Sequence, residues 1–209
     1  MVVGAHYDVC EDLPGADDNA SGVAGVLELA RLLDARVLRS PVELVAFSTE
    51  EPPYFRSPDM GSAVHARSLR AAGAEVRAMI SLEMIGYFAP SQHHRALLLS
   101  LVYPHRGDFI AVVGRWADRG LVREAKKCIR GATAVPPVSY SGPVGVGADL
   151  SDHLNYWVAG FPAFMITDTA FLRNPNYHRA SDTAVTLNYR RLAGVVDGVL
   201  STVVHLANE

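Results

Sequence analysis

The first 33 residues, MVVGAHYDVCEDLPGADDNASGVAGVLELARLL, contain an apolar run, a polar segment and a periodic apolar stretch. The short apolar run Met1–Ala5 predicts a buried β-strand. Ala20–Leu33 predicts an amphipathic helix, because its apolar residues recur at helical spacing. The residues on that apolar face are Val23, Val26, Leu27, Ala30 and Leu33. A buried strand followed by a helix of this length is typical of a βαβ unit in a parallel sheet.

Strand and helix patterns continue to alternate along the rest of the chain. Further strands are expected at Val42–Phe47, Val76–Met84 and Ala163–Thr167. Helices are expected at Met60–Ala72, Arg115–Arg130, Asp152–Ala159 and Tyr189–Ala207. The stretch Gly131–Gly147 is rich in Pro and Gly and predicts a long loop. This alternation indicates an α/β fold with a mainly parallel sheet.

Composition limits the classes of protein to which the chain can belong. Its 209 residues suit a single domain, and 49% of them are hydrophobic, a share typical of a soluble globular domain. Lys and Arg total 19 against 22 Asp and Glu, so the net charge of −3 gives no support for nucleic-acid binding. No apolar run approaches the length of a membrane-spanning helix. The two cysteines, Cys10 and Cys128, are too few for a disulfide framework and lack metal-knuckle spacing.

Polar residues follow each predicted strand of the sheet core. They are His6 and Asp8 after the first strand, Glu50–Glu51 after the second, Glu83 at the end of the third, and Tyr177–His178 in the loop after Ala163–Thr167. Asp17 and Asp18 add two carboxylates just before the first helix. Ligands of parallel α/β sheets bind beyond the carboxyl ends of the strands. We therefore expect these side chains to converge on one edge of the sheet.

Most of these elements have an ordinary structural explanation when each is taken alone. A histidine after a strand is often only hydrogen-bonded, Asp17–Asn19 would cap a helix and complement its dipole, and Glu50–Glu51 would be a solvated pair. Glu83 is harder to explain in this way, because it interrupts an apolar run and a buried carboxylate needs a partner or a metal. Several carboxylates at one sheet edge indicate a pair of divalent cations that would neutralise their repulsion.

The ordered motifs HYD, GADDNASG, TEE, SLEMIGY, SDH and YH resemble those of the di-zinc aminopeptidase family of clan MH metallopeptidases. This group includes bacterial leucyl-type aminopeptidases, glutamate carboxypeptidases and, more distantly, glutaminyl cyclases. The motifs span Val2 to about Thr183, and the ordered set is specific although each motif alone is weak. The resemblance implies one catalytic domain over residues 1–209. Its expected fold is a three-layer α/β/α arrangement with a mainly parallel mixed sheet, the phosphorylase/hydrolase-like zinc exopeptidase fold.

The resemblance also implies two zinc ions and a set of ligands. The five implied ligands are His6, Asp18, Glu51, Glu83 and His178. Asp18 would bridge both ions, His6 and Glu83 would complete the first site, and Glu51 and His178 the second. Family members often carry Asp where Glu83 stands, so the longer side chain departs from the pattern and puts metal spacing or denticity in doubt. Nitrogen and oxygen donors suit zinc, and sequence does not exclude cobalt or manganese as replacements in vitro.

Other positions match roles around the implied metals. Glu50 would be the general base that takes a proton from a two-zinc-activated water and passes it to the leaving amine. Tyr177 would help to stabilise the tetrahedral oxyanion. Asp8 would orient the ring of His6 from the second shell of ligands. Asp152, in the SDH motif, matches another position near the site, without a defined role.

We therefore expect a zinc exopeptidase, namely an aminopeptidase acting on peptides with a free N-terminus. One alternative is a glutaminyl cyclase-like transferase, which typically uses one zinc ion and carries Trp where this chain has Tyr177. A carboxypeptidase for acidic dipeptides would need cationic side chains, for which Arg56, Arg173 and Arg179 are the candidates. A non-catalytic relative serving as a binding module would have lost ligands, whereas all five positions here retain ligating chemistry.

The chain begins almost at its first implied ligand, His6. Relatives usually place a helix and further strands before this point, so the chain resembles a catalytic domain that lacks that N-terminal part. This predicts an exposed sheet edge or apolar groove near Met1–Gly4, through which a homo-oligomer would form. No signal peptide is visible, which favours a cytoplasmic location, although relatives are often exported.

Overall fold

Six strands form one mixed sheet in the computed structural model, which describes residues 1–94, 97–144 and 147–209. Their spatial order is β2-β1-β3-β6-β4-β5. The strands are β1 (Val2–His6), β2 (Glu43–Phe47), β3 (Met79–Glu83), β4 (Ile110–Arg115), β5 (Pro137–Gly142) and β6 (Ala163–Thr167). The first four in spatial order are parallel, while β4 pairs antiparallel with β6 and parallel with β5.

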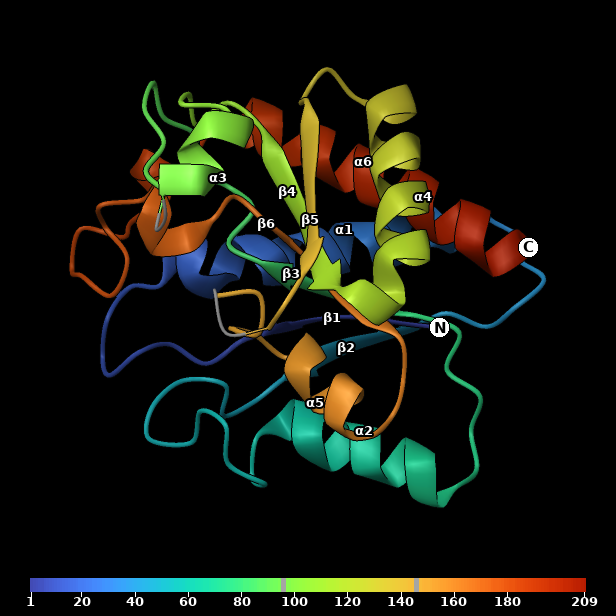
Figure 1. Cartoon of the computed structure of the whole chain (residues 1–209). Helices are drawn as coiled ribbons and strands as arrows, with labels where there is room; N and C mark the ends of the chain where they lie inside the picture. The colour runs from blue at the N-terminus through green and yellow to red at the C-terminus, as the bar shows by residue number, and fades with distance from the viewer. Residues whose placement is uncertain (95–96, 145–146) are drawn as a thin grey trace.

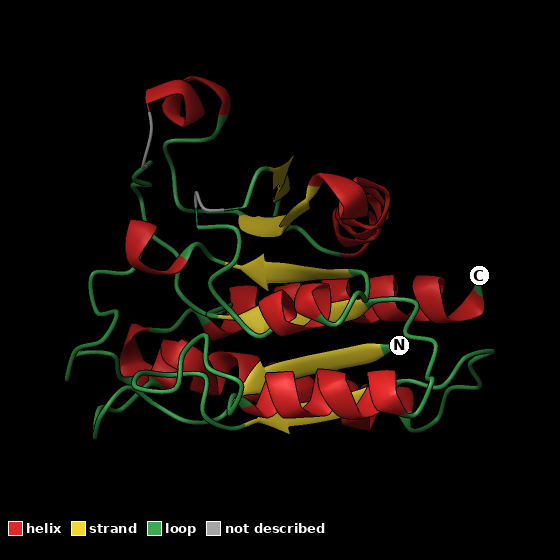
Figure 2. Ribbon diagram, turned by 60° about the horizontal axis from the view of Figure 1, so that its bottom comes forward, coloured by secondary structure: helices red, strands yellow, loops and turns green. Residues whose placement is uncertain are grey.

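Helices cover both faces of this sheet, as Figures 1 and 2 show. One layer contains α1 (Gly22–Leu33), α4 (Arg119–Ala132) and α6 (Tyr189–Asn208). The other contains α2 (Gly61–Ala71) and α5 (His153–Val158). A short helix, α3 (Leu97–Val102), stands apart from both layers (Figure 2). Within the described residues, no helix is both long and apolar enough to span a membrane.

Alternate residues along the strands supply the two hydrophobic cores. Val3, paired with Ile80 of β3, faces α1, α4 and α6, and Ile80 in turn pairs with Phe164 of β6. Val2 and Met79 lie one residue earlier in the same register and face α2 and α5. Both faces are therefore buried, which explains why these strands appear in the sequence as continuous apolar runs. The expected three-layer α/β/α fold is confirmed.

The prediction of a loop over Gly131–Gly147 is wrong for part of this range. It contains β5 at Pro137–Gly142, which pairs with β4 alone and forms one edge of the sheet. Pro137 is tolerated because it is the first residue of an edge strand, where a missing amide costs little. Residues 145–146 of the expected loop lie outside the described residues.

The expected exposure of Met1–Gly4 is also wrong. All four residues are buried, and β1 lies in the interior of the sheet between β2 and β3. The edge on this side is formed by β2, which comes later in the chain and supplies the hydrogen-bonding neighbour that β1 needs. The prediction of an oligomer through Met1–Gly4 required an exposed edge there, and these residues form no such edge.

The close pairing of β1 with β2 can be tested at Gly4. A Cβ at this position would overlap the buried ring of Phe47 and lie 3.0 Å from the carbonyl oxygen of Val45. We expect Gly4→Ala to lower the free energy of unfolding by about 1–3 kcal/mol, because the packed ring must move. Urea unfolding followed by far-UV circular dichroism would measure the change.

Gly120 in α4 provides the matched control, since an added Cβ there meets no described atom within 4 Å. Gly120→Ala should leave the free energy of unfolding unchanged or raise it by up to about 1 kcal/mol through helix propensity. Equal stability of Gly4→Ala and the wild type would contradict the proposed tight approach of β1 and β2.

Candidate metal centre

The parallel strands β2, β1, β3 and β6 bring their carboxyl ends to one edge of the sheet. The side chains gathered there come from β1 (His6), the segment η1 at Ala16–Ser21 (Asp18), the loop after β2 (Glu50, Glu51), β3 (Glu83) and the loop after β6 (His178). The structure thus brings together all five side chains implied as ligands, together with Glu50. All six lie in the sheet-edge position that the strand pattern predicted.

Asp18 lies between the two histidines. Its Oδ1 is 3.4 Å from His6 Nε2, and its Oδ2 is 3.2 Å from His178 Nε2. Glu83 Oε2 is 3.4 Å from the same nitrogen of His6, and Glu51 Oε2 is 3.2 Å from the same nitrogen of His178. Within 3.4 Å, each histidine Nε2 therefore faces two carboxylates, and Asp18 belongs to both groups.

These distances fit two cations better than they fit hydrogen bonds. Ligand atoms around a tetrahedral zinc ion lie roughly 3.3–3.6 Å apart, given bonds of about 2.0–2.2 Å. His6 Nε2, His178 Nε2 and Glu51 Oε1 are buried atoms without a hydrogen-bond partner in the described part of the chain. Buried polar atoms are normally satisfied, so atoms that converge without bonding to one another indicate a missing shared partner. The residues present fit a pair of divalent cations.

The pKa values of the side chains also indicate a site that favours cations. Burial raises the pKa of Glu50 well above its usual value, and the nearby carboxylate of Glu83 raises it further. Burial and the carboxylate of Asp18 raise the pKa of Glu51 to about 7. Burial lowers the pKa of His6, but Glu83 and Asp18 raise it more, so that it lies well above the usual value. The negative charges of this cluster therefore favour the uptake of protons or cations.

Asp8 organises the cluster in a way that differs in detail from the expectation. His6 Nδ1 donates a hydrogen bond to the backbone carbonyl of Asp8 at 3.1 Å, while the Asp8 carboxylate lies 3.6 Å from that nitrogen. The carboxylate accepts instead from the backbone amides of Glu50 and Glu51, at 3.2 and 3.0 Å. Asp8 thus turns Nε2 of His6 toward Asp18 and also fixes the loop that carries the two glutamates.

Glu83 is held by serines that sequence reasoning missed. Ser151 donates its hydroxyl to Glu83 Oε2 at 2.8 Å, and the hydroxyls of Ser81 and Ser151 are 2.7 Å apart. Ser151 is the first residue of the SDH motif, in which only Asp152 was singled out from the sequence. That motif position was the available signal, since a serine beside a buried carboxylate supplies the donor that the carboxylate needs.

The other two residues of the SDH motif have different surroundings. Asp152 is fully buried, and burial raises its pKa to about 7. Its charge interacts with His6 and Glu83, but its oxygens have no hydrogen-bond partner among the residues described. His153 packs in the core: its Nε2 lies 2.7 Å from the Ala148 carbonyl, and its ring meets Trp157 edge-on at 4.5 Å.

A second buried network fixes the segment that carries Asp18. The Asp182 carboxylate accepts from the backbone amides of Asp17 and Asp18, each at 3.1 Å. Asn19 accepts from the Gly22 amide at the start of α1 and from the Met84 amide after β3. Asn19 therefore does cap the helix, as its position suggested, and also ties η1 to the end of β3. Asp182 was missed, because nothing in its local sequence marks it.

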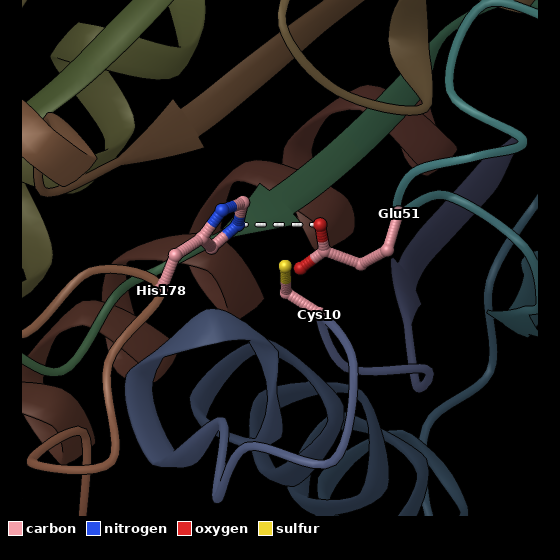
Figure 3. Close-up of side chains that lie close together, drawn as sticks. All are labelled: Cys10, Glu51 and His178. Atoms are coloured by element: carbon pink, nitrogen blue, oxygen red, sulfur yellow. Dashed lines mark ion pairs between the residues drawn. The ribbon is translucent and has the colours of Figure 1, made fainter.

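Tyr177 and Glu50 lie beside the side chains that surround His178 and His6, respectively. The ring of Tyr177 stacks on His178 with 3.8 Å between centroids, and burial together with the carboxylate of Asp18 raises its pKa. Glu50 Oε2 is 4.0 Å from His6 Nε2. The structure also places Cys10 close to Glu51 and His178 (Figure 3), a neighbour that we did not expect from the sequence.

A cavity of about 150 Å³ adjoins the centre at Glu83. Its walls are mostly apolar and include Phe109, Ala111, Val113 and Met165. These residues belong to β4, β6 and the segment before β4, so the antiparallel part of the sheet forms the floor of the cavity. An apolar cavity beside a polar centre is typical of a small-molecule or side-chain binding site.

Comparison with known proteins agrees with this arrangement. The model of peptidase family M28 matches residues 1–203. The chain is 52% identical to the uncharacterized protein YfbL of Escherichia coli K12 over 213 aligned residues, covering 96% of this chain and 65% of that protein. It is 28% identical to leucine aminopeptidase 1 of Grosmannia clavigera, covering 88% of this chain and 44% of that protein.

Among solved structures, the LapA aminopeptidase of Legionella pneumophila has a TM-score of 0.79 at 24% identity. The alignment covers 100% of this chain and 51% of LapA, which shows a shared fold. The chain thus spans about half to two thirds of the length of these proteins. With a family match over nearly its whole length, the chain belongs to peptidase family M28.

Proposed function

We propose that this protein is a zinc-dependent aminopeptidase, hydrolysing the peptide bond that follows a free N-terminal residue. The observation that carries the proposal is the position of Asp18, whose two oxygens face His6 and His178 at 3.4 and 3.2 Å. A carboxylate shared in this way is the arrangement expected for two neighbouring cations. Membership of a peptidase family and similarity to aminopeptidases support the choice of reaction.

In this proposal, His6, Asp18 and Glu83 would hold one zinc ion, and Asp18, Glu51 and His178 the other. When bound, the ions would polarise the scissile carbonyl and lower the pKa of the attacking water. Glu50 would accept the proton of that water and deliver it to the leaving amine. A raised pKa suits Glu50 to this role, because a general base is most effective when its pKa is near the working pH. Tyr177, stacked on His178, would donate to the developing oxyanion.

The surroundings of the centre favour a substrate with a cationic amine and an apolar first side chain. The buried carboxylates attract a free N-terminal amine, and the cavity beside Glu83 offers apolar walls. Two of the three arginines considered for an acidic substrate are already engaged. Arg56 pairs with Asp149 at 2.6 Å, and the buried Arg173 donates to the Phe109 carbonyl at 2.8 Å. These engagements favour an aminopeptidase over a carboxypeptidase for acidic dipeptides.

Glu50→Gln tests the role of the general base. The amide keeps the shape of the side chain but cannot take a proton, so activity should fall by about 100- to 10,000-fold. The zinc content should stay near about two equivalents per chain, because Glu50 is not one of the proposed ligands. Hydrolysis of leucyl-nitroanilide and metal analysis by mass spectrometry would give the two values.

Glu28→Gln, at a half-exposed position of α1 where the side chain pairs with Arg31, is the control and should keep full activity. Loss of the metal together with activity in Glu50→Gln would assign Glu50 to the ligands. Full activity in that variant would overturn its role as a base.

A substrate series tests the proposed specificity. We expect kcat/KM for a leucyl-nitroanilide to exceed that for an alanyl-nitroanilide by roughly tenfold or more, and N-acetyl-leucyl-nitroanilide to resist cleavage. Val113→Phe, which fills the cavity, should reduce cleavage of the leucyl substrate more than that of the alanyl substrate. Val185→Phe, at a site that is 91% exposed, should change neither value.

A glutaminyl peptide added to the same series separates hydrolysis from cyclisation, since a cyclase releases ammonia and leaves the peptide bond intact. Cyclisation without cleavage of any aminoacyl-nitroanilide would favour the transferase alternative.

Zinc binding should depend on pH because protons compete for the same side chains. The pKa of Glu51 is raised to about 7, so below this pH the side chain must lose a proton before it binds a cation. We expect the affinity of the metal-free protein for zinc to fall roughly tenfold or more between pH 8 and pH 6. Calorimetry in two buffers of different ionisation enthalpy should detect proton release at pH 6. Equal affinities at both pH values would contradict the inclusion of Glu51 among the ligands.

A further inference from the structure

Cys10 lies on the outer side of the cluster, next to Glu51 and His178, as Figure 3 shows. The three residues come from different segments: the loop after β1, the loop after β2 and the loop after β6. The sulfur of Cys10, a carboxylate oxygen of Glu51 and a ring nitrogen of His178 all lie within 4.8 Å of one another. A sulfur, an oxygen and a nitrogen donor thus converge from three parts of the chain.

The second observation concerns the atoms that the sulfur faces. Glu51 is only 4% exposed, and its Oε1 has no hydrogen-bond partner in the described parts of the chain. The carboxylate points toward Cys10 and His178 in Figure 3, with the sulfur beside it. His178 Nε2 is likewise a buried atom without a hydrogen bond to any described residue. The cysteine therefore lies near two residues that each have an unsatisfied ligating atom.

A small cavity of about 10 Å³ lies beside these residues. It is lined by Cys10, Asp18 and His178 together with Leu13, Gly15, Arg179 and Asp182, and Glu51 is not among its lining residues. The cavity has space for about one water molecule next to the sulfur and the histidine.

We propose that Cys10 is a sulfur ligand of the cation held by Asp18, Glu51 and His178; this inference rests on the proposed function. These three residues supply three nitrogen and oxygen donors, and Cys10 would complete a tetrahedral shell around this ion. The attacking water of the proposed function would then bind to the other ion, whose ligands His6, Asp18 and Glu83 leave a fourth position open. On binding, the S–H bond breaks, the proton passes to solvent, and a sulfur–zinc bond forms. Ligand atoms of tetrahedral zinc lie roughly 3.3–3.8 Å apart, so Cys10, within 4.8 Å of the other two atoms, needs to move by at most about 1.5 Å. Its place in an irregular loop allows this movement.

A sulfur donor has a consequence for metal choice. Thiolates strongly favour zinc and cadmium over manganese and magnesium, whereas carboxylates discriminate less between these ions. Of the two groups of side chains around Asp18, only the one with His178 has a sulfur within this distance among the described residues. The two cations would therefore be bound with different selectivity, the one near Cys10 being the more specific for zinc.

X-ray absorption spectroscopy of the zinc-loaded protein tests the proposal directly. We expect the wild type to show a sulfur scatterer at about 2.3 Å in addition to nitrogen and oxygen at about 2.0–2.1 Å. Cys10→Ser should lose the sulfur signal, and Cys128→Ser, which removes the other half-buried cysteine in α4, should keep it. In competition experiments, Cys10→Ser should also lower the preference for zinc over manganese by roughly tenfold or more.

A measurement on the wild type avoids dependence on any variant. Iodoacetamide should label Cys10 in protein treated with EDTA and be blocked by zinc, whereas labelling of Cys128 should be the same in both states. Mass spectrometry of the peptides would report each site. A zinc ion that only shields Cys10, without binding its sulfur, would also block labelling. In that case X-ray absorption would show nitrogen and oxygen as the only scatterers, and the proposal would be overturned.

The outcomes also separate this inference from the proposed function. If the protein holds two zinc ions and cleaves aminoacyl substrates but shows no sulfur scatterer, the proposed function stands and the role of Cys10 as a ligand is wrong. A sulfur signal that persists in Cys10→Ser would also show that Cys10 is not the ligand. A protein that binds no zinc under zinc-replete, chelator-free conditions contradicts both.

Discussion

Repulsion between buried carboxylates is the constraint on which the rest of this structure depends. Asp18, Glu50, Glu51 and Glu83 are each less than a tenth exposed and gather around two histidines, His6 and His178. Removing like charges from water and placing them together is costly unless opposite charge is supplied. The two histidines supply two positive charges at most, whereas the four carboxylates carry four negative charges when ionised. The fold therefore assembles a site whose charge is balanced when two divalent cations are bound.

Hydrogen bonds from other groups hold the carboxylates in place despite their repulsion. The Asp8 carboxylate accepts hydrogen bonds from the backbone amides of Glu50 and Glu51. The Ser151 hydroxyl donates to Glu83, and the Asp182 carboxylate accepts from the backbone amide of Asp18. These bonds fix the direction of each side chain through its backbone or through a neutral hydroxyl. In the described part of the chain, Glu51 Oε1 and the Nε2 atoms of His6 and His178 keep no hydrogen-bond partner and are available to a cation. Glu83 Oε2 accepts from Ser151 and retains a second lone pair toward His6.

The sequence predicted the fold and the positions of the implied ligands well, for a physical reason. Parallel strands end at the same edge, so polar residues after apolar runs, such as His6 and Glu83, must meet. The failures have equally clear causes. Whether Met1–Gly4 is covered depends on β2, which is more than thirty residues away in sequence, and β5 depends on pairing with β4. Cys10 was missed because its neighbours come from distant segments, so the local pattern carries no sign of the contact. Ser151 was missed although its place in the SDH motif was a signal, because its partner Glu83 lies 68 residues away in sequence.

The two halves of the centre differ in how they are built, and this difference favours different roles. His6 and Glu83 end adjacent strands of the sheet core and are surrounded by hydrogen-bonded neighbours, so their positions are tightly fixed. His178, Glu51 and Cys10 all come from loops, and the His178 side chain is 27% exposed. Loop residues adjust more easily to a ligand than strand residues do. The half next to His178 is therefore the part of the centre where substitutions would change the ligands of a bound ion without disturbing the sheet, and the proposed role of Cys10 would require no change in the strands.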